Sequence, residues 1–417
     1  MKIRNPWSWI PSLYFAEGLP YVVVMTLSVI MYKRMDISNT DIALYTSWLY
    51  FPWVIKPLWS PFVDLIKTKR WWIYTMQLLI GGGMAGVAFM LPGDFFFKAT
   101  LAFFWLMAFS SATHDIAADG FYMLGLSEEQ QAFFIGIRNT FYRVAMLTGQ
   151  GLLVMLAGFL EAATGRIPFA WSIVFFILAG MFVGLALWHK FILPKPAADI
   201  QRSQITAQTI FTEFTQTFIR FFSKKGIIPA LIFMLTYRLG ESQLVKLASP
   251  FLLDKSEVGG LGLETSQVGF AYGTVGVIAL LLGGILGGIA ISRKGLKYWI
   301  WPMALAISLP NLVYLYLAYA LPDSLFVINL CVGIEQFGYG FGFTAYTMYL
   351  MLFAEGEYKT SHYAISTGFM ALGMMLPGMI SGWIQEQIGY PYFFVWVMIC
   401  CIPLFLVIPF LKIKSGK

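Results

Sequence analysis

The sequence predicts an all-α membrane protein with twelve transmembrane helices in two six-helix bundles. Hydrophobic residues make up 59% of the 417 residues and charged residues only 12%, whereas a soluble domain carries about 25% charged residues. The apolar residues come in runs of about 20, the length that crosses the hydrocarbon core of a bilayer. The predicted helices cover 7–33, 41–64, 71–91, 97–126, 132–160, 168–193, 226–253, 265–292, 297–320, 323–353, 362–387 and 391–411.

Short clusters of charged residues, Pro or Gly separate these apolar runs. Charged residues are costly inside a bilayer, and Pro interrupts the hydrogen bonds of a helix. The clusters lie at 34–40, 65–70, 92–96, 127–131 and 161–167 in the first half, and at 254–264, 293–296, 321–322, 354–361 and 388–390 in the second half.

The net charge of +7 is interpreted as a topology signal and does not indicate nucleic-acid binding. With a cytoplasmic N-terminus, 18 Lys and Arg residues fall in cytoplasmic segments, and the opposite loops hold only Lys33, Arg34, Lys98, Arg166 and Lys255. This asymmetry follows the positive-inside rule. We therefore expect both termini in the cytoplasm, which requires an even number of helices. The first apolar run lacks a small-residue cleavage site, so we expect a retained helix and no signal peptide.

The only long polar stretch, 194–225, divides the chain into an N-terminal bundle (1–193) and a C-terminal bundle (226–417). Its residues 206–222 form either an amphipathic helix on the cytoplasmic surface or a plain tether. A short basic turn follows the second helix of each half, around Lys67 and around Arg293. Such a repeat is typical of the major facilitator superfamily, in which the substrate site lies at mid-membrane between the halves. The positive-inside rule alone also produces basic turns.

Five acidic residues lie deep inside the predicted helices. A charge at the middle of a membrane helix costs at least ~2.5–3.5 kcal/mol on insertion scales. A chain that tolerates five of them is expected to move a charged or proton-coupled solute, so a secondary transporter is the leading prediction. The candidate proton-coupling residues are Glu17, Asp115, Asp119, Glu241 and Glu335.

Two of these acids share one helical face. Asp115 and Asp119 are four residues apart, which places them on the same side of a helix. Counting from the turn near Glu129, Asp119 is level with Arg138 on the next helix, and Asp115 is level with Arg143. Two interpretations remain open: permanent ion pairs that lock the two helices together, or acids that exchange a proton or release their arginine to the substrate.

The other acids have fewer obvious partners. Glu241 has Arg238 three residues before it and Lys246 after it, so an internal pair is possible. Glu335 has no cation in its own helix and is expected to be neutral at rest. Glu17 lies in the stretch 15–20, where Gly and Pro are expected to break the helix and expose backbone groups to the cavity.

Several further side chains are candidates for contact with substrate or for gating. Arg238 is our choice as the cation that remains free for an anionic group, and His114 is either a proton relay or a packing residue. No cofactor or metal is expected, because the other histidines supply no ligand set, and the three cysteines give no disulfide framework. The substrate-binding candidates are His114, Tyr122, Arg138, Arg143, Arg238, Gln243, Lys246 and Gln336, and the gating or structural candidates are Lys56, Asp64 and Arg293.

Four short motifs together resemble one known family. Residues 111–119 read Ser-Ala-Thr-His-Asp-Ile-Ala-Ala-Asp, and residues 56–61 read Lys-Pro-Leu-Trp-Ser-Pro before Asp64. Residues 17–20 read Glu-Gly-Leu-Pro, and residues 250–253 read Pro-Phe-Leu-Leu. These stretches resemble the AmpG-type muropeptide permeases of the major facilitator superfamily, the branch that also includes an acetyl-coenzyme A carrier. The family has Gln where this chain has His114.

The resemblance implies proton-driven import of N-acetylglucosaminyl-anhydromuramyl peptides, or related amino sugars, across the bacterial inner membrane. The expected partners are protons, the lipid bilayer and an amino-sugar peptide, with the chain acting as a monomer by alternating access and not as an enzyme. Three alternatives remain: an exporter of a drug or metabolite, a sensor on a transporter scaffold, and a membrane-embedded sugar or acyl transferase that uses His114 and Asp115 as general base and orienting acid.

Overall fold

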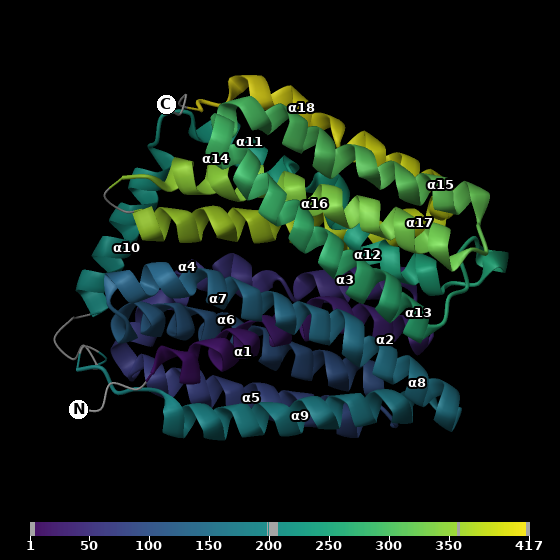
Figure 1. Cartoon of the computed structure of the whole chain (residues 1–417), viewed down its shortest axis with the longest axis horizontal. Helices are drawn as coiled ribbons and strands as arrows, with labels where there is room; N and C mark the ends of the chain where they lie inside the picture. Colours follow the sequence, from purple (N-terminus) through teal and green to yellow (C-terminus); the bar gives the residue numbers. More distant parts are fainter. Residues whose placement is uncertain (1–4, 198, 200–206, 357–358, 414–417) are drawn as a thin grey trace.

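The computed structural model describes residues 5–197, 199, 207–356 and 359–413, and within these ranges every regular element is a helix. The long helices run side by side along the longest axis of the molecule, and both termini lie at the same end (Figure 1). This arrangement confirms the predicted all-α membrane fold.

The described residues of the first half form nine α-helices and two π-helical turns. The 3-10 turn Pro6–Ser8 leads into one continuous helical rod made of α1 (Ile10–Val22), a π-helical turn (Val23–Leu27) and α2 (Ser28–Arg34). The others are α3 (Asn39–Trp48), α4 (Phe51–Ile66), α5 (Lys69–Met90), α6 (Phe96–Gly125), α7 (Glu128–Met146), the π-helical turn Leu147–Leu153, α8 (Val154–Thr164) and α9 (Ile167–Ile192).

The second half follows the helix α10 (Ala207–Phe222). Its helices are α11 (Ile227–Thr236), α12 (Leu239–Leu253), α13 (Thr265–Val268), α14 (Val277–Ser308), α15 (Leu312–Ala320), α16 (Leu325–Ala354), α17 (Lys359–Cys400) and α18 (Ile402–Val407). A π-helical turn (Gly269–Gly276) and three 3-10 turns (Ser256–Val258, Leu309–Asn311 and Ile408–Phe410) complete it.

Two helical stretches are too long for one membrane crossing. The spans Thr265–Ala320 and Lys359–Phe410 contain 56 and 52 residues, whereas about 20 residues cross a bilayer. Each contains a glycine with positive φ, Gly295 (74°) and Gly389 (75°), where the helix is interrupted. Glycine tolerates this backbone conformation because it lacks a Cβ atom. Dividing these two raises the eight apolar spans of the described residues to ten. With the helix pairs α3–α4 and α11–α12, the described helices are consistent with twelve crossings.

Polar side chains at the helix starts explain several boundaries. Ser38 accepts a hydrogen bond from the backbone of Asp41 and caps α3, and Thr68 caps α5 in the same way. Ser127 and Gln130 form a reciprocal capping box at the start of α7. Such side chains satisfy N–H groups that the first turn leaves unpaired.

The expected break at Gly18–Pro20 is wrong. Helix α1 continues through Pro20, and the irregular turn follows it. Gly18 is needed for packing instead, because a Cβ atom there would lie 2.9 Å from the backbone oxygen of Tyr142 in α7. The predicted helix 41–64 is in turn interrupted at Leu49 and Tyr50, between α3 and α4.

The two halves meet along two seams: α2, α3 and α4 pack against α12 and α17, and α8 with the π-helical turn Leu147–Leu153 packs against α13 and the π-helical turn Gly269–Gly276. Helices α3 and α4 pack against α17, and α2 packs against α12. In Figure 1 the first half occupies the lower part of the view and the second half the upper part. Helix α10 runs along the end that carries the termini, and its Phe221 is fully buried against the second half. The division of the chain into 1–193, 194–225 and 226–417 remains a proposal.

Candidate functional site

The first group of membrane charges joins α6 to α7. Asp119 Oδ1 on α6 lies 2.8 Å from a guanidinium nitrogen of Arg138 on α7. The prediction that Asp119 and Arg138 lie side by side on neighbouring helices is therefore confirmed. The Arg138 guanidinium also lies 4.5 Å from the ring centre of Tyr14 and 5.7 Å from that of Tyr122. These aromatic faces stabilise the cation in addition to the carboxylate.

Asp115 has a different partner from the one predicted. Its carboxylate lies 3.5 Å from Lys56 Nζ on α4 and accepts a hydrogen bond of 3.1 Å from the Trp53 indole. The polar contact of Arg143 is the sulfur of Met146, at 3.4 Å. The predicted Asp115–Arg143 pair is therefore wrong, and Lys56, a gating or structural candidate, holds Asp115 instead.

Helix packing explains this error. Counting from the shared turn assumes that α6 and α7 remain neighbours along their whole length. In the structure α7 packs mainly on α1, whereas α6 packs mainly on α5 and also on α4 and α1. The count therefore holds for Asp119, near the turn, and fails for Asp115, one helical turn deeper.

Glu17 completes the acidic group of the first half. It lies on α1, is buried, and within the described residues its Oε2 has no hydrogen-bond partner. Asp115 and Asp119 are close enough to interact with it electrostatically. The Asp119 side chain is 41% exposed and the Lys56 side chain 28%, so the edge of this group lies open at the surface of the fold while Glu17 remains buried.

The second half contains a buried ion pair between neighbouring turns. Arg238 Nε donates to Glu241 Oε2 at 2.7 Å, and the second guanidinium contact, to Oε1, is 3.1 Å. Arg238 also donates to the Tyr339 hydroxyl at 2.8 Å. The internal Arg238–Glu241 pair is confirmed, so the choice of Arg238 as a free cation is wrong.

Lys246 is the other buried cation of this half. It is 2% exposed, and Nζ donates to Thr46 Oγ1 of α3 at 3.0 Å. Nζ also lies 5.2 Å from the ring centre of Tyr50. No ion pair of Lys246 occurs among the residues that the structure describes.

The remaining polar candidates of the second half are hydrogen-bonded to neighbouring side chains. Gln336 donates to Glu335 Oε2 at 2.9 Å, and both side chains are buried. Gln243 accepts from the Trp396 indole at 2.8 Å and donates to Cys400 Sγ at 3.2 Å. Gln243 therefore holds α12 to α17 and is not free for substrate in this conformation.

His114 belongs to a buried network of hydrogen-bonded side chains that was not predicted from the sequence. Its Nε2 lies 2.9 Å from Gln77 Nε2 on α5, and Gln77 Oε1 lies 2.8 Å from His189 Nδ1 on α9. His189 Nε2 in turn lies 2.9 Å from the Ser12 hydroxyl on α1. Gln77, a polar residue within an apolar helix, is the signal in the sequence that indicates this network.

The other candidates lie closer to the end that carries the termini. Tyr122 donates its hydroxyl to the backbone oxygen of Gln131 at 2.5 Å. Arg293 is exposed beside the Gly295 turn. The side chain of Asp64 lies outside the described part of the chain.

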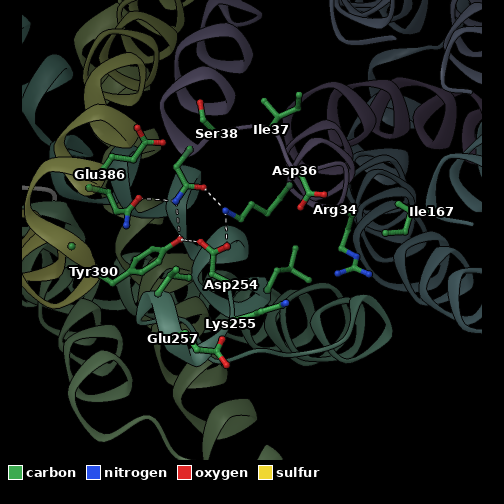
Figure 2. A pocket seen from close by; sticks show the side chains of 16 residues that line it. Arg34, Asp36, Ile37, Ser38, Ile167, Asp254, Lys255, Glu257, Glu386 and Tyr390 are labelled. Carbon is green, nitrogen blue, oxygen red and sulfur yellow. Dashed lines mark hydrogen bonds and ion pairs between the residues drawn. The ribbon is translucent and has the colours of Figure 1, made fainter. Parts of the chain in front are cut away.

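Contacts between the halves join them at the end of the bundle away from the termini. Lys33 Nζ lies 2.6 Å from Asp254 Oδ1, and the Tyr390 hydroxyl donates to Asp254 Oδ2 at 2.6 Å. Asn39 donates to Tyr390 and to Gln385 at 2.9 and 2.6 Å. Figure 2 shows this network on one wall of a pocket of about 830 Å³. We call Lys33, Asn39, Asp254, Gln385 and Tyr390 the latch.

A second group of contacts strengthens the same end. Glu161 on α8 is buried and accepts hydrogen bonds from Arg34, Trp171 and Thr265. Thr265 belongs to the second half, so this carboxylate also joins the halves. Thr40 binds Glu386 through its backbone and hydroxyl groups at 3.0 and 2.6 Å.

Comparison with known proteins gives relatives over nearly the whole length of the chain. The putative transporter AmpG 4 of Rickettsia conorii is 25% identical over 416 residues, which cover 96% of this chain and 95% of that protein. The anhydromuropeptide permease of Escherichia coli K12 is 24% identical over 405 residues, which cover 94% of this chain and 76% of the permease. The resemblance to AmpG-type permeases is confirmed. No protein-family model matches the chain.

Solved transporter structures share the fold of the AmpG-like chain. A POT family transporter in complex with 5-aminolevulinic acid aligns with a TM-score of 0.73 at 11% identity, covering 98% of this chain and 96% of that one. A D-xylose–proton symporter aligns with a TM-score of 0.70 at 11% identity, covering 98% and 97%. The chain is thus a multi-pass membrane protein with the fold of the major facilitator superfamily. Its relatives are permeases and transporters, in agreement with the predicted secondary transporter and against the transferase alternative.

Proposed function

We propose that the AmpG-like chain imports anionic amino-sugar peptides of the anhydromuropeptide class, together with protons, across the bacterial inner membrane. We infer the proton coupling from the group formed by Glu17, Asp115 and Asp119. Three acids lie within electrostatic reach of one another, and two of them pair with the cations Lys56 and Arg138. Burial and neighbouring acids both disfavour three simultaneous charges, so one of these carboxyls is suited to hold a proton.

The distribution of Lys and Arg supports cytoplasmic termini, because 18 basic residues fall on that side and five on the other. With this orientation, the latch closes the periplasmic end. The partly exposed Asp119 and Lys56 then face the cytoplasmic side. This conformation corresponds to a carrier that has closed behind its cargo and faces inward, with a single chain sufficient for the cycle.

The ion pairs provide a mechanism for coupling. Protonation of Asp115 removes the charge that holds Lys56, and protonation of Asp119 releases Arg138. Each release changes the contacts between α6 and its neighbours α4 and α7, and thereby the relative stability of the two conformations. Arg143 is half-buried and has no ion-pair partner among the described residues, so it is suited to hold an anionic group of the cargo in the inward-facing conformation.

Transport by purified protein in liposomes tests this proposal. A labelled anhydromuropeptide should accumulate when the outside is acidified, and accumulation should stop in Asp115→Asn or Asp119→Asn while exchange without a gradient continues. The exposed Asp94→Asn variant is the matched control and should behave as the parent. Unimpaired accumulation in both membrane variants would contradict the coupling role, and substrate movement against the proton flux would indicate an exporter.

A further inference from the structure

We infer that Lys246 binds the carboxylate of the transported solute, and that this site becomes accessible only when the latch opens. The inference rests on the proposed function, since it concerns the anionic group of that cargo. It assigns the site to α12 of the second half, separate from the acids of the first half.

The first argument is charge balance. Lys246 is 2% exposed and lies among α3, α12 and the ring of Tyr50. The ammonium group has three donors, and the polar contact that the structure gives it is the hydroxyl of Thr46 at 3.0 Å. Burying a charge is costly unless an opposite charge and hydrogen bonds compensate it. A carboxylate is the group that supplies both.

The second argument is that the other cations already have partners or lie elsewhere. Arg238 is held by Glu241, and Arg138 is held by Asp119. Arg143 belongs to the first half and is half-buried. Among the described cations inside the membrane helices of the second half, Lys246 is therefore the one that remains for an incoming anion.

The third argument is location. Thr46 and Lys246 belong to different halves, so their hydrogen bond crosses the junction. The same junction is packed tightly beside it, since a Cβ atom at Gly378 of α17 would lie 2.6 Å from the hydroxyl oxygen of Ser47. Along α3 and α12, both residues lie between the middle of the bundle and the latch. Opening the latched end must separate α3 from α12 and remove Thr46 from Lys246.

These arguments describe a site whose affinity alternates. In the latched conformation the Lys246 ammonium group is hydrogen-bonded to Thr46 and buried, so a carboxylate does not reach it. In the opened conformation Lys246 loses Thr46 and binds the carboxylate of the solute through charge-assisted hydrogen bonds. Closing the latch restores Thr46 and displaces the carboxylate toward the half-buried Arg143. Differential affinity of this kind is what a ligand needs to shift a conformational equilibrium.

The experiment compares an anhydromuropeptide with its amide, in which the carboxyl groups are neutral, by binding to the purified full chain. We expect the parent to bind the acid about tenfold or more tightly than the amide. Lys246→Gln should reduce this ratio to about one, and Lys246→Arg should retain a preference for the acid. Lys98→Gln, which removes an exposed cation, is the matched control and should keep the parent ratio.

Each result decides the inference. A Lys246→Gln variant that keeps the parent ratio overturns it, even when the parent transports the peptide as proposed. Equal binding of acid and amide by the parent also overturns it, and binding of neither overturns both proposals. If the parent prefers the acid but shows no proton-driven accumulation, the proposed function fails, and the Lys246→Gln ratio still judges this site.

Folding defects are controlled with two further variants. Lys246→Met keeps an unbranched side chain of similar length in an apolar site, so it replaces the Gln variant if that variant does not fold. Thr46→Val removes the competing hydroxyl and leaves the lysine in place. It should increase the preference for the acid above that of the parent, whereas an unchanged or smaller preference counts against the inference.

Discussion

Removal of the Asp254 carboxylate should open the latched end of the bundle. Asp254 accepts from Lys33 at 2.6 Å and from Tyr390 at 2.6 Å. It thereby joins α2 to the part of α17 that follows the interruption at Gly389. In Asp254→Asn the hydrogen bond to Tyr390 can persist, but the ion pair is lost. Lys33 then keeps only its 2.9 Å contact with Asn39.

The magnitude follows from the burial of the pair. A hydrogen bond to a charged group contributes about 1.5–3 kcal/mol when buried, and an exposed ion pair about 0.2–1 kcal/mol. The Lys33 and Asp254 side chains are 15% and 16% exposed, so about 2 kcal/mol is a reasonable value. Since about 1.4 kcal/mol corresponds to a factor of ten, the open population should rise about 30-fold.

The assay is the modification of a cysteine placed behind the latch. Ser47 is fully buried and packs against Gly378, so Ser47→Cys is a small change at a position that is reached only after opening. The three native cysteines, Cys331, Cys400 and Cys401, are replaced by Ala. A membrane-impermeant maleimide should then react about 30-fold faster in the Asp254→Asn variant.

Glu257→Gln is the matched control, because Glu257 is exposed, lines the same pocket and carries the same charge (Figure 2). Its labelling rate should equal that of the parent with Ser47→Cys. Equal labelling of the Asp254→Asn variant and the control would refute the idea that this ion pair holds the end closed. Fast labelling of the parent would show that the latched conformation is not the dominant one.

Three further predictions concern stability, each measured by expression and by the melting temperature of the purified protein. Asp119→Asn should lower the melting temperature because it leaves Arg138 without its carboxylate, and Asp119→Asn with Arg138→Gln should recover part of the loss; no recovery would mean that the pair contributes little. Glu241→Gln should cost more, about 3–5 kcal/mol, because Arg238 is buried and loses its partner, and the apolar double variant Arg238→Met with Glu241→Leu should restore folding. Gly340→Leu should prevent folding, because even a Cβ atom there would collide with the backbone oxygen of Leu280 where α14 and α16 cross; a stable Leu variant would contradict this packing.

The sequence was sufficient for the features that depend on local spacing. Hydropathy and polar clusters gave the helices, because membrane crossings need long apolar runs. Arg238 and Glu241 are three residues apart on the same helical face, so their pairing needed no knowledge of the fold. Asp119 and Arg138 flank one turn, where neighbouring helices remain close whatever their later course.

Contacts between distant segments could not be predicted by counting residues along neighbouring helices. Asp115 binds Lys56 because α6 packs on α4 and α1, an arrangement set by the whole bundle. The contact of Lys246 with Thr46 spans 200 positions of the chain, and it exists only because the two halves close on each other. The close approach of Gly18 in α1 to Tyr142 in α7 is likewise a contact between distant segments.

The pairing of membrane charges indicates what the cargo must contribute. Asp115, Asp119 and Glu241 have cationic partners. Of the five acids deep in the membrane helices, Glu17 and Glu335 have no ion pair among the described residues, and the deep cations without one there are Arg143 and Lys246. An unpaired buried carboxylate is neutralised most simply by a proton, and an unpaired cation by an anion. The charges that the fold leaves unmatched are therefore those that a proton and an anionic solute would complete, which is the combination expected of a proton-coupled carrier for acidic amino-sugar peptides.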